Sequence, residues 1–252
     1  MIGVELNLVN QKIVVIGFGS QANKVIKYLK KINISPKYIY LKKIKKKHGK
    51  LKNFTTSLKD IEKCNIIFIC SPHNTHFFYI KKFLLKKNTY IFCEKPPVNN
   101  LRDLNYLKKL KPKNLYFNFN YRFTLIANIL RNTRKYKLGN LLYGTIVLTH
   151  GLATKKNYYK SWRADRLNTP FGIVEILSVH FIDLMINIFG LSKVSFNNHK
   201  VLQKSKNFDT SCVNLLTNDK KSIVIFNSYT SPLVEKKLFI FKNGYIDQNE
   251  RT

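Results

Sequence analysis

Acidic residues are scarce in this chain of 252 residues, which has 13 Asp and Glu against 45 Lys and Arg and a formal net charge of +32. Such an excess first suggests a nucleic acid or another polyanion as partner. However, the basic residues are spread along the whole chain, and Asn, Ile, Tyr and Phe are abundant together with Lys. This joint bias is typical of an AT-rich genome, so the composition does not favour nucleic-acid binding.

Cysteines and long apolar runs are also few. Cys64, Cys70, Cys93 and Cys212 show no spacing typical of a disulfide framework or a metal site. No apolar run approaches the ~20 residues of a membrane span. Residues 1–10 lack the basic segment followed by an apolar core that marks a signal peptide. We therefore expect reduced thiols in a soluble cytoplasmic protein with no membrane partner.

Only 10 glycines are present, and two of them stand in the motif Gly17-Phe18-Gly19-Ser20-Gln21-Ala22. It follows a β-branched run, Lys12 to Ile16, and precedes a helical apolar pattern, as G-x-G-x-x-G/A does in dinucleotide-binding proteins. Gly17 would permit the tight turn, and Gly19 would let a pyrophosphate approach the helix N-terminus. Ala22 would keep the helix close to the strand. The motif predicts a dinucleotide site.

The end of the second expected strand, 38–41, bears on the choice of cofactor. An NAD site usually has an acidic residue there, which binds the ribose hydroxyls. This chain has Lys42 and Lys43 instead. Cations suit a 2′-phosphate, so the sequence favours NADP slightly over NAD.

The stretch Thr89 to Pro97 predicts a functional lysine. Tyr90 to Cys93 is a short apolar run typical of a buried strand. Pro96 ends the run and favours extended backbone before it. Lys95 should then project from the carboxyl end of a core strand, where α/β sheets bind ligands. Glu94 would orient the ammonium group or accept a ribose hydroxyl.

A further buried strand, 65–70, leads into Ser71-Pro72-His73-Asn74-Thr75-His76. His73 and His76 suggest metal ligands, but no third ligand is nearby in the sequence. We therefore interpret Ser71, Pro72, His73 and His76 as a loop that faces the cofactor, and predict no metal.

The alternation of strands and helices changes after about residue 124. The first half predicts a doubly wound parallel sheet, that is, a Rossmann-type α/β domain over residues 1–121. Strands are expected later at 142–150, 193–202, 210–216, 222–229 and 236–241, without helices between the last four. Together with a helix at 173–189 they predict an α+β substrate and oligomerisation domain over residues 122–252, built on an open antiparallel sheet.

The apolar helix expected at 173–189 carries Glu175, His180 and Asp183. His180 and Asp183 are three residues apart and share a helix face, whereas Glu175, five residues before His180, would lie well off it. Buried polar groups need partners. His180 and Asp183 either form a structural pair or meet Lys95, in which case His180 suits proton transfer near neutral pH.

Taken together, these motifs resemble the Gfo/Idh/MocA family of oxidoreductases. The matching segments are Gly17 to Ala22, Ser71 to His76, Glu94-Lys95-Pro96, Asn120-Tyr121-Arg122-Phe123, and Gly172 through His180 to Asp183. The resemblance implies a Rossmann domain followed by an open-sheet domain, and NAD(P)-dependent oxidation or reduction of a sugar, cyclitol or sugar nucleotide.

The resemblance also implies roles for individual residues. Lys95 would bind and polarise the reacting oxygen, and His180 would be the acid/base on that oxygen, with Asp183 beside it. Tyr121 and Arg122, and Trp162 and Arg163 in the loop 151–166, would contact the substrate. The open sheet implies a possible homo-oligomer.

Two departures from the family pattern leave an alternative open. Ile176 occupies the position four before the histidine where many members have aspartate, and Ser178 stands where glycine is common. The chain is also short for the family. A catalytically impaired cofactor-binding protein of the same fold is therefore the second hypothesis, and a basic nucleic-acid-binding protein is the third.

Overall fold

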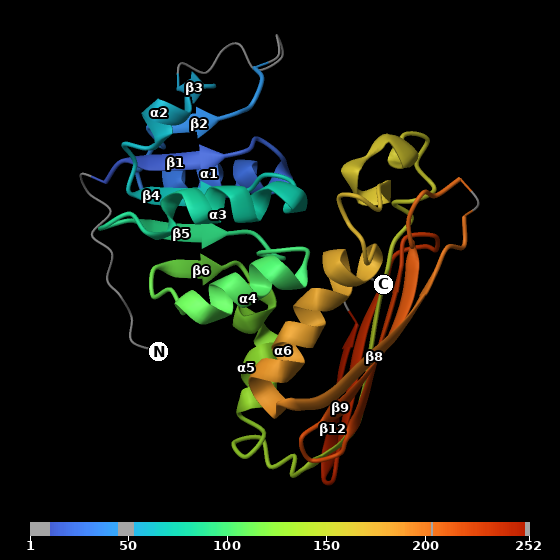
Figure 1. The fold of residues 1–252 in the computed structure, drawn as a ribbon. Coiled ribbons are helices and arrows are strands. Elements are labelled where there is room, and N and C mark those ends of the chain that lie inside the picture. The colour runs from blue at the N-terminus through green and yellow to red at the C-terminus, as the bar shows by residue number, and fades with distance from the viewer. Residues whose placement is uncertain (1–10, 45–52, 203, 250–252) are drawn as a thin grey trace. The chain divides into compact units, whose positions relative to one another are not determined.

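The computed structural model (Figure 1) describes residues 11–44, 53–202 and 204–249. The segment 1–10, on which the expectation of no signal peptide rests, lies outside these residues. The chain divides into two compact units, Met1–Asn118 and Phe119–Thr252, and each has a buried apolar cluster of its own. Within the described residues, no helix combines the length and the apolar character needed to cross a bilayer.

The first unit is built on a six-stranded sheet in the order β3-β2-β1-β4-β5-β6, and every neighbouring pair is parallel. Its strands are β1 (Ile13–Ile16), β2 (Tyr38–Tyr40), β3 (Phe54–Thr55), β4 (Ile66–Ile69), β5 (Tyr90–Cys93) and β6 (Leu115–Phe117). The helices are α1 (Ser20–Lys31), α2 (Leu58–Ile61), α3 (His76–Leu84) and α4 (Leu101–Leu110). This topology confirms the doubly wound Rossmann-type sheet.

Helices cover both faces of this sheet, because side chains alternate between the faces along each strand. Val14 and Ile16 of β1 belong to a buried cluster with Phe83 of α3 and Leu107 of α4. Ile13, one residue away from Val14, instead packs with Leu29 of α1. α1 and α3 therefore lie on opposite faces, and strands buried on both sides are uniformly apolar.

The second unit contains a six-stranded sheet in the order β12-β11-β7-β10-β9-β8. Its strands are β7 (Leu141–Thr149), β8 (Leu191–His199), β9 (Thr210–Thr217), β10 (Ser222–Ser228), β11 (Val234–Phe241) and β12 (Gly244–Asn249). The sheet is mostly antiparallel, as expected, but β7 and β10 pair in parallel. A long connection that includes α6 (Val179–Phe189) joins these two strands, and parallel neighbours require such a crossover.

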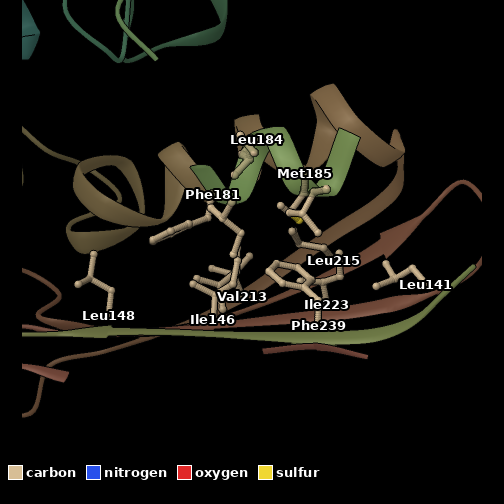
Figure 2. Packing of buried hydrophobic residues seen from close by; sticks show 14 of the residues in the cluster. Leu141, Ile146, Leu148, Phe181, Leu184, Met185, Val213, Leu215, Ile223 and Phe239 are labelled. Carbon is tan, nitrogen blue, oxygen red and sulfur yellow. The ribbon is translucent and has the colours of Figure 1, made fainter. Parts of the chain in front are cut away.

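The apolar face of α6 packs on one face of this sheet (Figure 2). Phe181, Leu184 and Met185 point from the helix onto Ile146 and Phe239, which come from β7 and β11. By the helical spacing, Asp183 then lies on the side of α6 away from the sheet, and His180 lies on the flank of the helix.

Local side-chain bonds lie at one helix end. α5 (Leu125–Arg131) ends at the residue before Asn132. The side-chain amide of Asn132 donates to the main-chain oxygen of Asn128 at 2.7 Å. Local bonds of this kind compete with helix continuation. A short 3-10 turn, His73–Thr75, precedes α3.

Candidate functional site

Three of the expected site segments gather at one edge of the first sheet. Gly17 follows β1, Ser71 follows the Cys70 that ends the β4 segment, and Glu94 follows β5. β4 pairs in parallel with both β1 and β5. Parallel neighbours end at the same edge, which is where open α/β sheets bind ligands. The structure therefore brings together the glycine turn, the loop after β4 and the Glu94-Lys95 segment.

The two glycines of the turn have different structural roles. Gly17 has φ +102°, and a Cβ atom there would lie 2.7 Å from the main-chain oxygen of Cys70. No side chain fits this position, because both the dihedral angle and the space are unsuitable. A Cβ on Gly19 would meet no atom within 4 Å. The space beside Gly19 is open, as required for close approach of a ligand.

The residues at this turn fit the pyrophosphate of a dinucleotide. Gly19 is the N-cap of α1, where no side chain accepts a bond from the first turn of the helix. The N-terminal N–H groups of a helix attract anions, and α1 has 12 residues. Phe18 packs edge-on against Phe54, with ring centroids 5.0 Å apart. Lys42 and Lys43 are exposed after β2, and no acidic residue occurs between Tyr38 and Ile44.

Glu94 and Lys95 are both buried at the end of β5, and Lys95 is 8% exposed. The side-chain amide of Asn118 donates to Glu94 Oε1 at 2.6 Å. Burial raises the pKa of the Glu94 carboxyl, whereas the bond from Asn118 and the charge of Lys95 oppose that change. A lysine so deeply placed beside a ligand-binding edge is unusual for a side chain that is normally solvated.

The ring of His76 braces two of the loops at this edge. Nδ1 lies 2.7 Å from the carbonyl oxygen of Pro96, and Nε2 lies 2.8 Å from that of Ser71. Burial lowers the pKa of His76 to about 4 although both carbonyls act in the opposite sense. A neutral imidazole has one N–H, so His76 donates to only one of these two carbonyl oxygens. Because both ring nitrogens lie against main-chain oxygens, we assign His76 to shaping the loop rather than to direct cofactor contact.

His73 lies close to this brace, with its ring centroid 5.5 Å from that of His76. Throughout the described residues, no group of three or more His, Cys, Asp or Glu side chains is placed to hold a metal ion.

In the second unit, a π-helical turn over Val174–Ser178 leads directly into α6. Hydrogen bonds in a π-turn join residues five apart, whereas those of an α-helix join residues four apart. The wider turn changes the rotation of Glu175 about the helix axis relative to His180, compared with a continuous α-helix. Glu175 is 7% exposed, and its carboxylate accepts a long bond from the N–H of Phe171 at 3.5 Å.

His180 packs among aromatic rings of the segment that precedes α5. Its ring centroid lies 5.1 Å from that of Tyr121 and 6.5 Å from that of Phe119. The expectation that Tyr121 belongs to the same site as His180 agrees with this contact.

Asp183 forms a two-point ion pair with Arg122. Arg122 Nε donates to Asp183 Oδ2 at 2.7 Å, and a second guanidinium nitrogen, Nη2, donates to Oδ1. The pair raises the pKa of Arg122. Both carboxylate oxygens therefore bind Arg122, because the fork of a guanidinium matches the two oxygens of a carboxylate. Arg122 also lies over the ring of Phe119.

The two departures in the π-turn have structural explanations. Ile176 packs in an apolar cluster with Tyr158, Ala164 and Tyr229. Ser178 is fully buried, and its hydroxyl donates to Asn227 Oδ1 of β10 at 2.6 Å. A buried hydroxyl with such a partner is tolerated in the core.

The loop between β7 and the π-turn places Trp162 and Arg163 together. The guanidinium of Arg163 lies 4.4 Å from the centre of the Trp162 ring, a cation–π contact. The main-chain oxygen of Arg163 accepts from Thr169 at 3.2 Å, which fixes the loop. Gly172 turns the chain into the helix at φ +56°, where a Cβ would lie 2.5 Å from the oxygen of Phe208.

Two family models match this chain in order. Residues 11–115 match the model described as "Oxidoreductase family, NAD-binding Rossmann fold", and residues 134–231 match the "Oxidoreductase family, C-terminal alpha/beta domain". Both models are those of Gfo/Idh/MocA. The chain belongs to the Gfo/Idh/MocA family. It is accordingly an NAD(P)-dependent oxidoreductase by family, with the two-domain fold described above.

Solved structures agree with this fold. A putative NADPH-dependent oxidoreductase from Desulfitobacterium hafniense superposes with a TM-score of 0.81 at 17% identity, covering 94% of this chain and 72% of that one. A myo-inositol dehydrogenase from Corynebacterium glutamicum gives 0.78 at 18%, covering 95% and 75%. Levoglucosan dehydrogenase in complex with NADH and L-sorbose gives 0.79 at 16%, covering 95% and 73%. No curated protein sequence matches the chain.

Two features of this Gfo/Idh/MocA chain were not foreseen from the sequence. The π-turn has no residue signal of its own, since its residues suit an α-helix equally well. The Arg122–Asp183 pair joins residues 61 positions apart. A clue to it was the presence of both residues in family motifs.

Proposed function

We propose that this protein transfers a hydride between a nicotinamide dinucleotide and a CH–OH carbon of a sugar, cyclitol or sugar nucleotide. The observation that carries the proposal is the buried Lys95 at the same sheet edge as the open Gly19 turn. Solved structures with this fold include dehydrogenases of myo-inositol and levoglucosan, and the latter was solved with NADH and L-sorbose. These names support a polyhydroxylated substrate.

The proposed chemistry assigns one residue of each unit to the reacting oxygen. When bound, the dinucleotide accepts the hydride from the substrate carbon or returns it. Lys95 supplies a positive charge that stabilises the alkoxide which develops as the hydride leaves. His180 takes the hydroxyl proton during oxidation and returns it during reduction. Arg122 and Asp183 hold the segment that packs against His180. Tyr121, Trp162 and Arg163 are proposed to contact the sugar.

Glu175 favours an active enzyme over an impaired one. We propose that the π-turn brings this buried carboxylate toward His180, although Ile176 replaces the aspartate found in many family members. We propose that Glu175 binds a hydroxyl group of the substrate and supports the charge of His180 during proton transfer. Glu175→Gln should then lower turnover and change its pH dependence, while dinucleotide binding stays the same.

The finer choice of cofactor rests on the residues after β2. Exposed Lys42 and Lys43 favour the 2′-phosphate of NADP modestly, because a cation–phosphate contact near a surface contributes on the order of 1 kcal/mol. Parallel titrations with NAD and NADP test this preference. Equal or tighter binding of NAD would contradict it.

A homo-oligomer is proposed through the face of the second sheet that points away from α6. Tyr143, Phe226 and Tyr245 are exposed there on three strands, beside inward-facing neighbours. Aromatic side chains on an open sheet face suit burial against a second copy. Sedimentation of wild type and Phe226→Glu tests this: loss of the dimer only in the variant supports it, and a monomeric wild type refutes it.

We also place the protein in the cytoplasm, with its four thiols free.

The decisive experiment is a screen of sugars, cyclitols and sugar nucleotides followed by nicotinamide absorbance. Turnover of one class by wild type, lost in Lys95→Ala, supports an active dehydrogenase. Saturable dinucleotide binding without turnover of any compound favours the impaired alternative. Salt-sensitive binding of polyanions with no cofactor preference would favour a nucleic-acid partner instead.

A further inference from the structure

Arginine is rare in this chain, which has 38 lysines and only 7 arginines. Arginine differs from lysine in its planar fork with five donors, which can bind an oxyanion at two points. Three of the seven, Arg122, Arg131 and Arg134, fall within 13 consecutive residues. All three belong to the second unit, and Arg122 is already explained by its pair with Asp183.

Arg131 and Arg134 line a pocket of about 800 Å³ that lies wholly within the second unit. The pocket is formed by the end of α5 and the segment after it, the end of α6, and the turn between β9 and β10. Asn187 of α6 lines it, seven residues beyond His180, which is roughly 10 Å along a helix axis. The pocket is therefore separate from the surroundings of His180, although the same helix serves both.

The lining is polar and carries a net positive charge. Arg131, Arg134 and Lys221 provide three cations against one carboxylate, Asp219. Arginine forks and a lysine ammonium suit the oxygens of a phosphate group. The volume falls in the range of small-molecule sites.

Other lining residues suit the remainder of a ligand. Asn140 and Asn187 offer amide groups, and Asp219 is a hydrogen-bond acceptor that a simple anion would not use. Leu141 and Phe241 give the pocket an apolar part. Amides, one carboxylate and an apolar wall together match the hydroxyl groups and the C–H face of a sugar. The combined chemistry is that of a sugar phosphate.

A chain of bonds connects this pocket with the helix that carries His180. Arg131 donates through Nη2 to Asn187 Oδ1 at 2.9 Å and through Nη1 to the main-chain oxygen of Arg122 at 2.7 Å. Arg122 in turn holds Asp183, three residues after His180. A phosphate that attracts the Arg131 guanidinium competes with both of its bonds, and the change is transmitted to the Arg122–Asp183 pair.

We propose that this pocket binds a small sugar phosphate and that its occupancy is sensed at His180 through Arg131 and Arg122. The site is distinct from the proposed catalytic residues and does not depend on the identity of the substrate. It would let the level of a phosphorylated sugar adjust the enzyme.

Calorimetric titration of the 252-residue chain with glucose 6-phosphate, at about 0.15 M salt to screen diffuse attraction, tests the binding. Wild type should bind one equivalent. The double variant Arg134→Gln/Lys221→Gln should bind at least tenfold more weakly. The matched control Lys135→Gln/Lys220→Asn removes the same charge from exposed neighbours that do not line the pocket, and should stay within twofold of wild type. Absence of binding by wild type, or equal weakening in both variants, would overturn the site.

The same titration is repeated with inorganic phosphate and with glucose, each of which carries one half of the proposed ligand. Each should bind at least tenfold more weakly than glucose 6-phosphate. If inorganic phosphate binds as tightly as the sugar phosphate, the proposed ligand class is wrong.

The link to His180 is measured by the histidine ring signals in NMR spectra, with His180 assigned from the spectrum of His180→Gln. Glucose 6-phosphate should shift this signal in wild type. Arg131→Lys keeps the charge but not the fork, so it should retain binding within a few-fold and lose most of the shift. An unchanged His180 signal at saturation in wild type would refute the link. These readouts need no turnover, so they remain valid if the proposed activity fails.

Discussion

The two units position their proposed site residues in different ways. In the first unit, a parallel sheet buried on both faces brings three strand ends together, and each contributes a short segment, as Gly17, Ser71 and Lys95 show. In the second unit, a mixed sheet is covered on one face only, and His180 depends on a π-turn and on contacts with Tyr121. The glycine turn of the first unit therefore acts through local backbone geometry, whereas Asp183 of the second unit depends on its long-range contact with Arg122.

This difference determines what a mutation should change. At the edge of the parallel sheet, the backbone of the glycine turn forms the proposed binding surface, so adding one methyl group to a glycine should change ligand binding or stability. Beside α6, Arg122 and Asp183 bind each other, so the effect of replacing one depends on whether the other is present.

The largest expected effect comes from removing one proposed catalytic residue from each unit. Lys95→Ala and His180→Ala should each lower turnover by about a hundredfold to ten-thousandfold. Because both would serve one step, the double variant should lose much less than the product of the two effects. Steady-state kinetics with calorimetric cofactor titration as control measure this. Full multiplicativity would show that the two units act in separate steps.

The two glycines of the first unit should respond differently to a methyl group. Gly17→Ala should cost about 2–4 kcal/mol of unfolding free energy, because its Cβ would lie 2.7 Å from a carbonyl oxygen at φ +102°. Gly19→Ala should cost at most about 1 kcal/mol, yet weaken dinucleotide binding at least tenfold. Denaturant unfolding and calorimetry measure the two quantities. An unchanged cofactor affinity in Gly19→Ala would contradict the site.

The His76 brace makes stability at the parallel edge depend on pH. Its folded pKa of about 4 lies below the unfolded value near 6.5, so the unfolded chain takes up a proton first as the pH falls. Through His76, the free energy of unfolding should therefore fall by up to about 3 kcal/mol between pH 7 and pH 4. His76→Gln should flatten this dependence relative to wild type, measured by unfolding at several pH values.

Exposed His199 provides the matched control for that measurement. His199→Gln should retain the wild-type dependence. If both variants gave the same pH profile as wild type, the assigned role of His76 would be wrong. The raised pKa of Glu94 acts in the opposite sense, and comparing variants with wild type removes its contribution.

The smallest expected effect tests the long-range pairing of the second unit. A double-mutant cycle with Arg122→Gln and Asp183→Asn should give a coupling energy of about 1 kcal/mol, because the Arg122 side chain is 40% exposed to solvent. A coupling energy of zero would show that the Arg122–Asp183 pair does not stabilise the second unit.

Much of the fold could be predicted because its signals are local. The run Ile13–Ile16, the glycine turn and the helix after it show strand, turn and helix without reference to the rest of the chain. The same holds for β5 before Lys95. The parallel pairing of β7 with β10 could not be predicted this way, since it joins strands far apart in sequence and follows from the path of the chain between them.

The sequence by itself determined the glycine turn, the position of Lys95 after a buried strand and the family motifs, because each depends on neighbouring residues and their backbone preferences. Only the tertiary structure decided the partners of the polar side chains. Asp183 binds Arg122, the His76 ring lies between two main-chain oxygens, and the buried Glu175 stands in a π-turn. The physical reason is that hydrogen bonds and ion pairs require distances of about 3 Å. Only the folded chain sets such distances between residues remote in sequence.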